Sequence, residues 1–416
     1  MNPQQFLFGS RMSEAEAISL TISSMNEYGP RHNHWVIAWS GGKDSTATLT
    51  LILNLLDAGL IAPPRSLTVC YADTRMEIPP LWISARKIMQ QLDCRGIEVI
   101  EAVAKMEKRF LPYMLGRGVP PPSNTFRWCT GHIKVEPMEQ AVEGIFRKTG
   151  EKLLVITGVR QGESAVRDGR ISMSCSKNGA ECGQGWYQTG LDGDIASTLA
   201  PILHWRLCHV WDWLKVFAPS KSRTLIPEYP GLSGGAWDTA VLADAYGGEQ
   251  AEEVNARTGC MGCPLASKDK ALEAVVKMDD WKYLAPLLGL KPLYREMKLA
   301  RHRLRKPGGE KRKDGTLSKN QNRMGPLTLK ARQYFLNEFL RIQNEVNWQA
   351  DQQGRPRVDF LNDQEVALIV RMRNEGVWPD GWSGSEPVAD QLMHSSYHDG
   401  SVLLNLFVSP TPIHTP

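Results

Sequence analysis

A short glycine loop between an apolar strand and an amphipathic helix constrains this chain more than any other feature. The run His34–Trp39 predicts a buried strand, and apolar residues recur at helical spacing through residues 45–60. The loop between them reads Ser40, Gly41, Gly42, Lys43, Asp44, Ser45. Backbone N–H groups at a helix N-terminus, which glycines leave open to close approach, predict a binding site for an anion.

Two charged residues of the loop make phosphate the expected anion. Lys43 would neutralise phosphate charge. Asp44 would position Mg²⁺, which prefers a carboxylate together with phosphate oxygens and water. An ordinary glycine turn between strand and helix is the alternative, and the glycine spacing differs from that of a Walker A loop.

Strand and helix patterns alternate along the first half of the chain. Further strands are predicted at residues 67–72, 97–103 and 152–157, and helices at 13–27, 80–93 and 135–147. This alternation predicts an α/β fold, a parallel sheet with helices on both faces. Ligands of such sheets bind at the carboxyl ends of the strands, so the loops at Ser40, Asp73 and Gly158 are expected to meet at one edge.

The second half of the chain has a different character. The glycine-rich residues 179–193 predict a long loop, whereas residues 208–217 carry the pattern of a packed helix. Later helices are predicted at residues 272–288, 327–346 and 363–375. We therefore expect a first domain over residues 1–265, a helical basic region over 266–380 and a loosely ordered tail over 381–416.

The net charge of +4 conceals a strong asymmetry. Residues 291–332 hold 14 Lys or Arg against three acids, a balance of +11 that leaves −7 on the rest of the chain. A segment with this much positive charge is expected to bind a nucleic acid, and a solvated charged helix is the alternative. The sequence has neither an apolar run of membrane-spanning length nor a secretory signal pattern at residues 1–10, so a cytoplasmic location is expected.

Eight scattered cysteines argue against a disulfide scaffold and favour metal or redox chemistry. Cys260 and Cys263 have the two-residue gap typical of zinc or iron–sulfur ligation, or of a redox dithiol. Cys129 offers a third thiolate, and Cys182 is preferred to Cys175 as the fourth because of its glycine-rich surroundings. The remaining cysteines, Cys70, Cys94 and Cys208, are expected to be buried structural residues.

The loop and three further strings resemble the PP-loop ATP pyrophosphatases, and within them the phosphoadenosine phosphosulfate (PAPS) reductase family. The strings begin Asp-Thr-Arg-Met-Glu at residue 73, Arg-Trp-Cys-Thr at 127 and Thr-Gly-Val-Arg-Gln-Gly-Glu-Ser at 157. The resemblance implies an adenine nucleotide alpha-hydrolase-like fold that binds ATP. It implies catalytic roles for Lys43, Asp44, Arg160 and Glu163.

The same resemblance implies which other residues contact the nucleotide. Asp73 and Thr74 would hold the adenosine, residues 40–45 and Gly158 the phosphates, while Arg160 and Arg167 would line the phosphate or substrate side. Two alternatives rest on the residues alone. Asp73 could cap a helix, and Arg160 with Arg167 could be a surface pair.

Residues 259–273 and 325–332 resemble the DndC-type (SspD-type) sulfur-insertion proteins of DNA phosphorothioation. The family resemblance favours a 4Fe–4S cluster at Cys260 and Cys263, with Cys129 and Cys182 as the expected further ligands. The DndC-type resemblance implies DNA as a partner, a cysteine desulfurase as sulfur donor, further phosphorothioation subunits and an oligomeric state. The sequence departs from the pattern in two places. Cys129 would match the second cysteine of the tandem Cys-Cys pair of the reductases, and Trp128 stands where the first would be. Residues 247–257 lack the additional cysteines of DndC-type proteins.

These observations predict an ATP pyrophosphatase that adenylates a DNA backbone phosphate so that sulfur replaces a non-bridging oxygen, with AMP and pyrophosphate as products. A sulfonucleotide reductase is one alternative, although the chain has no cysteine after Cys263 to act as its nucleophile. A PP-loop tRNA thiolase is another, because the basic segment does not distinguish DNA from RNA. A nucleotide-sensing DNA-binding subunit without catalysis is the alternative from a different class.

Overall fold

The computed structural model describes residues 12–162, 168, 186–191, 194–221, 227–248, 259–306, 315–316, 323–392, 394–396 and 402–404. The chain forms two compact units, and each is assembled from separate stretches of sequence. The first comprises Met1–Lys105, Trp128–Met261 and Asp269–Lys282, and the second comprises Met106–Arg127, Gly262–Lys268 and Tyr283–Pro416. The boundary predicted at residue 265 falls in the short stretch 262–268 of the second unit.

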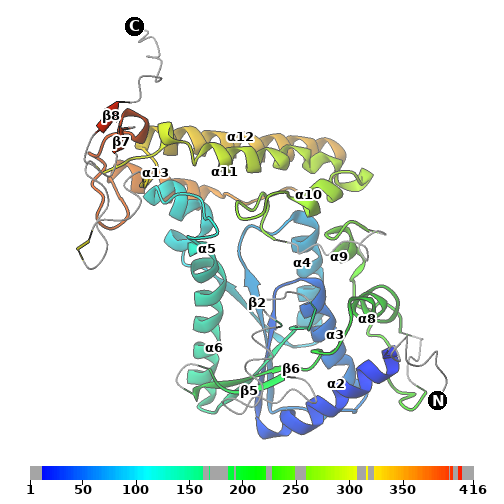
Figure 1. Cartoon of the computed structure of the whole chain (residues 1–416). Coiled ribbons are helices and arrows are strands. Elements are labelled where there is room, and N and C mark those ends of the chain that lie inside the picture. The colour runs from blue at the N-terminus through cyan, green and yellow to red at the C-terminus, as the bar shows by residue number, and fades with distance from the viewer. Residues whose placement is uncertain are drawn as a thin grey trace, which may run out of the picture. The chain divides into compact units, whose positions relative to one another are not determined.

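The described residues of the first unit form a six-stranded sheet in the order β3-β2-β1-β4-β6-β5 (Figure 1). All neighbouring strands are parallel except β5, which pairs antiparallel with β6. The parallel sheet predicted from the sequence is confirmed for β1, β2, β3, β4 and β6, and β5 adds an antiparallel edge strand. The strands are β1 His34–Trp39, β2 Ser66–Asp73, β3 Glu98–Val103, β4 Leu153–Thr157, β5 Trp186–Leu191 and β6 Ala196–Ala200.

Strand β5 corrects the prediction that residues 179–193 are all loop. Its Tyr187 is buried and stacks on Tyr28 with ring centroids 4.6 Å apart. The Tyr187 hydroxyl donates to Ser197 of β6 at 3.2 Å. The stacking partner Tyr28 lies far away in the sequence, and a local glycine-rich pattern cannot reveal it.

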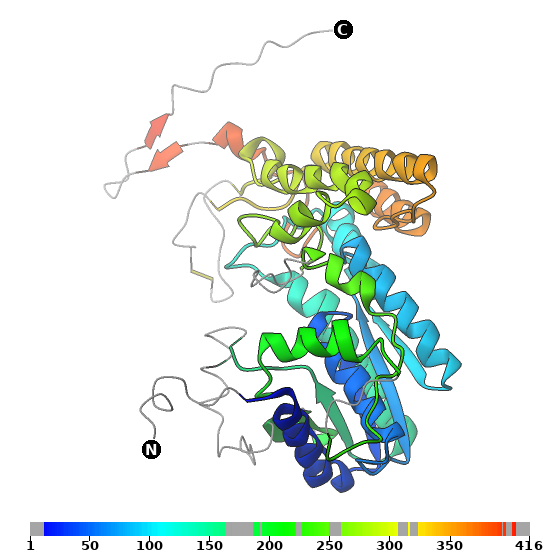
Figure 2. The same ribbon diagram turned by 90° about the vertical axis from the view of Figure 1, so that its right-hand side faces the viewer.

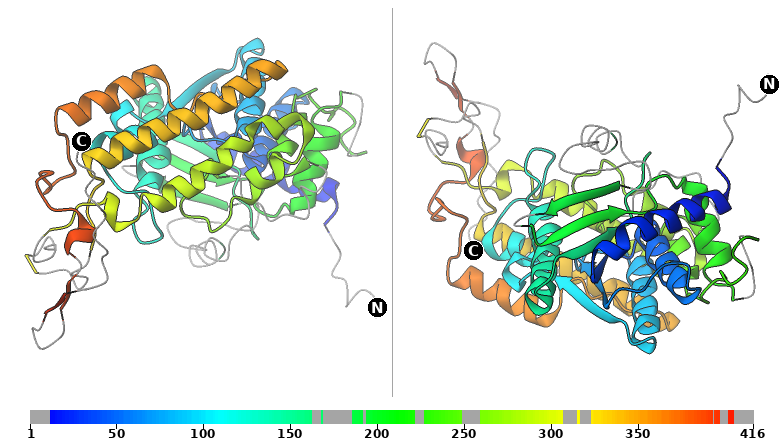
Figure 3. Two further views of the ribbon diagram at one scale, coloured as in Figure 1. Left: turned by 90° about the horizontal axis from the view of Figure 1, so that it is seen from above. Right: turned by 90° about the horizontal axis from the view of Figure 1, so that it is seen from below.

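Helices cover both faces of the sheet (Figures 1 and 3). Helix α6 lies on one face, and α3 and α4 lie on the other. Together with α2, these helices confirm the four predicted in this part of the chain. Their bounds are α2 Glu14–Tyr28, α3 Lys43–Asp57, α4 Pro79–Cys94 and α6 Glu136–Thr149.

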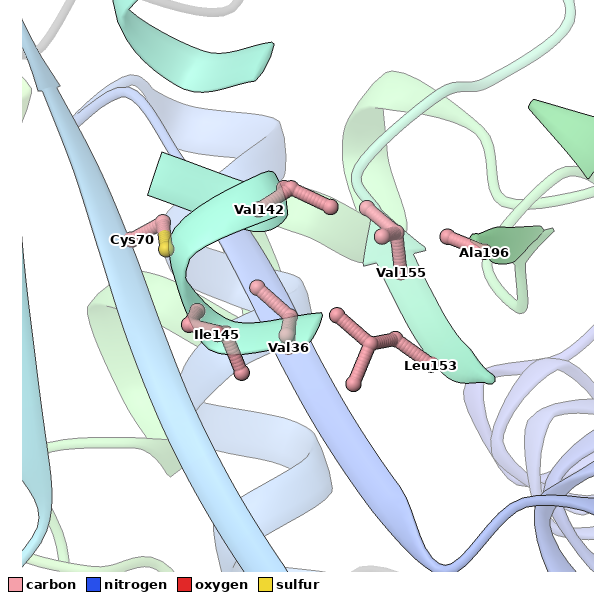
Figure 4. Packing of buried hydrophobic residues seen from close by; sticks show 7 residues of the cluster. All are labelled: Val36, Cys70, Val142, Ile145, Leu153, Val155 and Ala196. Atoms are coloured by element: carbon pink, nitrogen blue, oxygen red, sulfur yellow. The ribbon is translucent and has the colours of Figure 1, made fainter. Parts of the chain in front are cut away.

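A buried apolar cluster joins α6 to the sheet (Figure 4). Val142 and Ile145 of α6 pack against strand residues that include Val36 and Val155. Cys70 of β2 belongs to this cluster, so its predicted core position is confirmed. The predictions for Cys94 and Cys208 are wrong because both are exposed: Cys94 is the last residue of the amphipathic helix α4, and Cys208 lies in the first turn of α8 (Leu207–Asp212).

The helices between β6 and the second unit's long helices are short. Helix α8 continues into the π-helical turn Trp213–Phe217, which confirms a helix at residues 208–217. Helix α9 spans Ala240–Asp244. The single helix predicted at residues 272–288 is wrong: α10 spans Lys270–Val275, and Asp279–Gly289 is a 3-10 segment. Pro286 lies within that segment, where its missing N–H group disfavours a regular α-helix.

The second unit contains α11 Leu290–Glu296, α12 Leu329–Gln353 and α13 Asp363–Asn374, of which α11 and α12 lie side by side (Figure 2). The helices predicted at residues 327–346 and 363–375 are thus confirmed. A short strand pair, β7 His394–Ser396 and β8 Val402–Leu404, lies within the predicted tail. None of the helices in the described ranges is long and apolar enough to cross a membrane.

Buried arginines connect the elements of the second unit. Arg332 is fully buried and donates to the carbonyl oxygens of Gly116 and Val377, each at 2.9 Å. Its guanidinium lies 3.8 Å from the ring centroid of Trp378. Arg303 is also buried and donates to the carbonyl oxygens of Met324 and Gly325. Burial lowers the pKa of Arg303 to about 10 and that of Arg332 to about 9, so both remain charged at neutral pH.

Candidate active site

The glycine loop joins β1 to the N-terminus of α3, as the sequence predicts. Gly41 has φ +72°, in the left-handed region that favours glycine, and Gly42 is the N-cap residue of α3. The Ser45 hydroxyl lies 3.1 Å from that of Ser40 and donates to the Gly42 carbonyl oxygen at 3.1 Å. These bonds hold a tight turn, and a glycine N-cap offers the first N–H groups of the helix no side-chain acceptor.

Asp44 lies between two cations at the start of α3. Its Oδ2 accepts from Lys43 Nζ at 2.9 Å, and its Oδ1 accepts from Arg160 Nε at 2.6 Å. Arg160 is 5% exposed and also donates to the carbonyl oxygen of Trp205 at 3.2 Å. Arg160 is therefore not the surface residue of the alternative interpretation.

The charge state of Asp44 follows from these contacts. Burial favours the neutral carboxyl group, but the adjacent Lys43 and Arg160 outweigh burial and hold the pKa of Asp44 below its ordinary value. Asp44 is thus ionised at neutral pH, with one negative charge shared between two positive ones. The three side chains together carry a net positive charge beside the helix N-terminus, which favours an anionic ligand.

Gly158, which follows β4, packs directly against this loop. A Cβ atom placed on Gly158 would lie 2.7 Å from both the backbone N and the Cα of Ser45, far inside contact distance. Only a glycine allows the two loops to approach so closely. The structure thus brings together the loop at Ser40 and the string that contains Gly158 and Arg160.

At the end of β2, Asp73 begins a tight turn. Its Oδ1 accepts from the backbone N of Arg75 at 2.7 Å, and Arg86 Nη2 lies 3.8 Å from Oδ2. Asp73 does not cap α4, because the N-cap residue of that helix is Ile78. The Thr74 hydroxyl and backbone N–H both donate to Glu77.

Glu77 is a residue of this turn to which sequence reasoning gave no role. Burial, and then the neighbouring Asp73 carboxylate, raise the pKa of Glu77 to about 7. A carboxyl group with such a pKa can exchange a proton at neutral pH. Within the first unit, Glu77 also pairs through its backbone with Cys260, and Met261 N donates to the carbonyl oxygen of Met76 at 2.7 Å. Cys260 therefore lies beside the turn that follows β2.

A cavity of about 850 Å³ opens between α6 and the carboxyl ends of the strands. Its walls are mainly apolar, with a few hydroxyl and charged groups. It extends from the glycine loop along β4 to the middle of β6, and its lining includes Ser40, Ala72, Thr157, Thr198, Met138 and Val142. Apolar walls with a few polar groups are typical of small-molecule sites, and this volume is large enough for a nucleoside.

The predicted cluster ligands are only partly described. Cys129 lies in α5 (Trp128–Thr130) of the first unit, Cys263 belongs to the second unit, and Cys182, like Glu163 and Arg167, is outside the described residues. In the described part of the chain, no group of three or more His, Cys, Asp or Glu side chains could hold a metal ion. The 4Fe–4S cluster therefore stays a prediction, and no chemical step is derived from it.

Three cations of the basic segment bind the loop that follows Cys263. Lys291 donates to the carbonyl oxygens of Cys263 and Ala266 at 3.0 and 2.6 Å. Arg295 donates to that of Ser267 and Lys298 to that of Pro264. Burial, followed by the neighbouring cations, lowers the pKa of Lys298. Part of the positive charge counted from the sequence is therefore hydrogen-bonded to the backbone of this loop within the second unit.

Comparison with known proteins agrees with the site in the first unit. Residues 34–217 match the family model of the phosphoadenosine phosphosulfate reductase domain. The matched stretch begins at β1, ends with the turn after α8, and contains the glycine loop, Asp73, Gly158 and Arg160. The match supports a PAPS reductase-like, PP-loop core for this part of the chain.

Two curated relatives come from Methanocaldococcus jannaschii. The uncharacterized protein MJ0973 is 25% identical over 206 residues, which are 49% of this chain and 42% of the relative. The uncharacterized protein MJ0066 is 26% identical over 179 residues, which are 43% of this chain and 31% of the relative. The chain thus spans less than half the length of either relative.

Among solved structures, the chain is similar to a phosphoadenylyl-sulfate reductase from Candida auris in complex with phosphate, at 12% identity and TM-score 0.30, covering 51% of this chain and 82% of that one. It is also similar to the U34-tRNA thiolase NcsA from Methanococcus maripaludis with its 4Fe–4S cluster. That similarity has 14% identity and TM-score 0.31, and it covers 68% of this chain and 82% of the thiolase.

Proposed function

We propose that this protein binds ATP with its pyrophosphate end in the loop at residues 40–45 and cleaves it to AMP and pyrophosphate. The observation that carries the proposal is Asp44, held between Lys43 and Arg160 at the N-terminus of α3. This arrangement places two positive side chains and the backbone N–H groups of a helix N-terminus where the charge of a departing pyrophosphate would accumulate.

The adenosine moiety has a matching place beside the loop. The cavity adjoining Ser40 and Ala72 has mainly apolar walls, as an adenine ring requires. Its volume of about 850 Å³ exceeds that of a nucleoside, so an acceptor group can enter beside the nucleotide. Asp73 follows Ala72 at the end of β2, so its carboxylate stays the proposed contact for the ribose at this edge of the sheet.

Mg²⁺ fits the site through Asp44. This carboxylate is ionised and lies in the loop itself, and a hard oxygen ligand next to phosphate oxygens is what Mg²⁺ prefers. When ATP binds, Lys43 can turn from Asp44 Oδ2 towards a phosphate oxygen and leave that carboxylate oxygen for the metal. Bound there, Mg²⁺ would neutralise charge on the pyrophosphate.

The chemistry begins with attack by an acceptor oxygen on the α-phosphorus of ATP. The bond from that phosphorus to the β-phosphate oxygen breaks, and pyrophosphate leaves into the glycine loop. For a DNA phosphate as acceptor, a persulfide sulfur then attacks the activated phosphorus and AMP leaves. A second thiol cleaves the remaining S–S bond by exchange, so that sulfur replaces one non-bridging oxygen.

DNA phosphorothioation is the specific form of this proposal. It is supported by the basic second unit and by the resemblance of residues 259–273 and 325–332 to DndC-type proteins. The proposal includes a cysteine desulfurase as sulfur donor, further phosphorothioation subunits, an oligomeric assembly and a cytoplasmic location. The absence of a cysteine after Cys263 counts against the alternative of a reductase.

The products of ATP cleavage test the proposed reaction. Purified protein incubated with ATP, Mg²⁺, duplex DNA and a persulfide donor is expected to form AMP and pyrophosphate in equal amounts, measured by ion-exchange chromatography. Formation of ADP and phosphate would contradict the proposal. Tight ATP binding without turnover would instead favour a nucleotide-sensing subunit.

Salt dependence tests the nucleic-acid partner. Arg301, Arg323 and Lys330 are exposed cations of the second unit. Changing all three to Ala should weaken binding to duplex DNA and lower the slope of log affinity against log salt by roughly 0.9 for each phosphate contact removed. The control changes three exposed cations of the first unit, Arg65, Arg147 and Lys148. Equal losses in both variants would show that the second unit is not the contact surface.

A further inference from the structure

Tyr246 occupies the helix N-terminus at which an anion is expected to bind. It lies just after α9 in the first unit and is 4% exposed. Its hydroxyl oxygen accepts a hydrogen bond from the backbone N of Lys43 at 3.0 Å. Lys43 is the first residue of α3, so this N–H is one of the groups that the helix itself leaves without an acceptor.

Tyr246 lies close to two residues of the glycine loop, Gly42 and Lys43. A Cβ atom placed on Gly42 would lie 3.2 Å from the Tyr246 hydroxyl, so the hydroxyl rests directly against the loop backbone. The ring of Tyr246 lies 5.1 Å from Lys43 Nζ, within the range of a cation–π contact. One tyrosine therefore contacts both the backbone N–H and the ammonium group of Lys43.

Surrounding contacts fix Tyr246 in this position. Its ring meets Trp211 of α8 edge to face, with centroids 5.3 Å apart. Its backbone N donates to the Ala243 carbonyl oxygen at 2.9 Å. Asp244, the last residue of α9, accepts a hydrogen bond from the indole N–H of Trp281 at 2.8 Å. Trp211 thus packs on the ring, and the other two bonds anchor the backbone of the turn after α9, so the hydroxyl can leave the Lys43 N–H only if the ring tilts.

We propose that the Tyr246 hydroxyl is a placeholder that a phosphate oxygen of the pyrophosphate group displaces from the Lys43 N–H. An ionised phosphate oxygen is a stronger acceptor than a neutral phenol, so the exchange favours the ligand. The buried hydroxyl must nevertheless give up its bond, and this opposes binding. Tyr246 thereby sets how tightly the loop holds pyrophosphate, and so how readily that product leaves. This inference rests on the proposed function.

Tyr246→Phe isolates the hydroxyl, because the ring keeps its contacts with Lys43 and Trp211. The variant is expected to bind pyrophosphate roughly three- to tenfold more tightly than the wild type, the effect of removing one competing hydrogen bond. AMP, which does not carry the pyrophosphate end, should bind both proteins equally. Isothermal titration calorimetry with Mg²⁺-pyrophosphate and with AMP measures the two affinities, and a thermal melt confirms that the variant is folded.

Tyr187→Phe is the matched control. Tyr187 is also a buried tyrosine of the first unit, with its hydroxyl bonded to Ser197 and His32, and His32 precedes the start of β1, at the end opposite the glycine loop. It should leave both affinities unchanged. Unchanged or weaker pyrophosphate binding by Tyr246→Phe would overturn the placeholder role while leaving the proposed function intact. A wild type that binds neither ATP nor pyrophosphate would overturn both.

Discussion

Replacing Asp44 with Asn is expected to reduce the formation of AMP and pyrophosphate by roughly a hundred- to thousandfold. The Asn side chain keeps the size of Asp but loses the negative charge that orients Lys43 and Arg160. It also offers Mg²⁺ a neutral amide in place of a carboxylate. Charge stabilisation of the leaving pyrophosphate depends on all three groups.

Stability must be separated from catalysis in this experiment. Loss of the Asp44 charge leaves Arg160, only 5% exposed, without its ionic partner, and breaking such a buried pair costs about 3–5 kcal/mol. Turnover should therefore be measured at a temperature at which circular dichroism shows the variant to be folded. Asp57→Asn serves as the control, since Asp57 ends the same helix and pairs at the surface with Arg95.

A double-mutant cycle adds a sharper criterion. Arg160→Gln and Asp44→Asn act on the same contact, so the combined variant should lose far less activity than the product of the two single losses. Full additivity would show that Asp44 and Arg160 act independently. Wild-type turnover in Asp44→Asn would remove the residue from the reaction altogether.

The sequence predicts the part of the site that local patterns encode. A strand, six loop residues and a helix follow one another without interruption, so the geometry around Ser40 and Asp44 follows from neighbouring residues. The meeting of this loop with Gly158 follows from the general rule that parallel strands end at one edge. Neither inference requires knowledge of tertiary packing beyond the sheet itself.

Residues that depend on tertiary packing escape such reasoning. Tyr246 lies more than two hundred positions from the loop, and nothing in its local sequence distinguishes it from a core tyrosine. Arg332 and Lys291 raise the basic count of residues 291–332, yet both are buried and bonded to carbonyl oxygens. A charge tally assumes exposed side chains, so it overstates the positive surface that is left for a nucleic acid.

Gly158→Ala should test the contact on which the site geometry depends. Gly158 does not have a left-handed backbone conformation, so only lack of space excludes a side chain. The added methyl group would meet the backbone of Ser45 at 2.7 Å, and because this neighbour is main chain it cannot rotate away. Overpacking of this kind costs about 1–3 kcal/mol of folding stability.

The effect on activity is expected to exceed the effect on stability. The least costly relief moves the glycine loop by a fraction of an ångström away from β4, and a misplacement on the order of 1 Å can cost about a hundredfold in rate. Turnover of ATP should therefore fall by about that factor in Gly158→Ala, with a modest decrease in melting temperature. Steady-state kinetics and a thermal melt measure the two quantities.

Gly144→Ala adds the same methyl group at an unhindered position, and it is expected to raise stability instead of lowering it. Gly144 lies within α6, and a Cβ atom there would meet no other atom within 4 Å. Alanine at an unhindered helical position should stabilise the protein by about 0.5–1 kcal/mol and leave turnover unchanged. If Gly158→Ala behaved like Gly144→Ala, the close packing of β4 on the glycine loop could not be what positions Asp44 against Arg160.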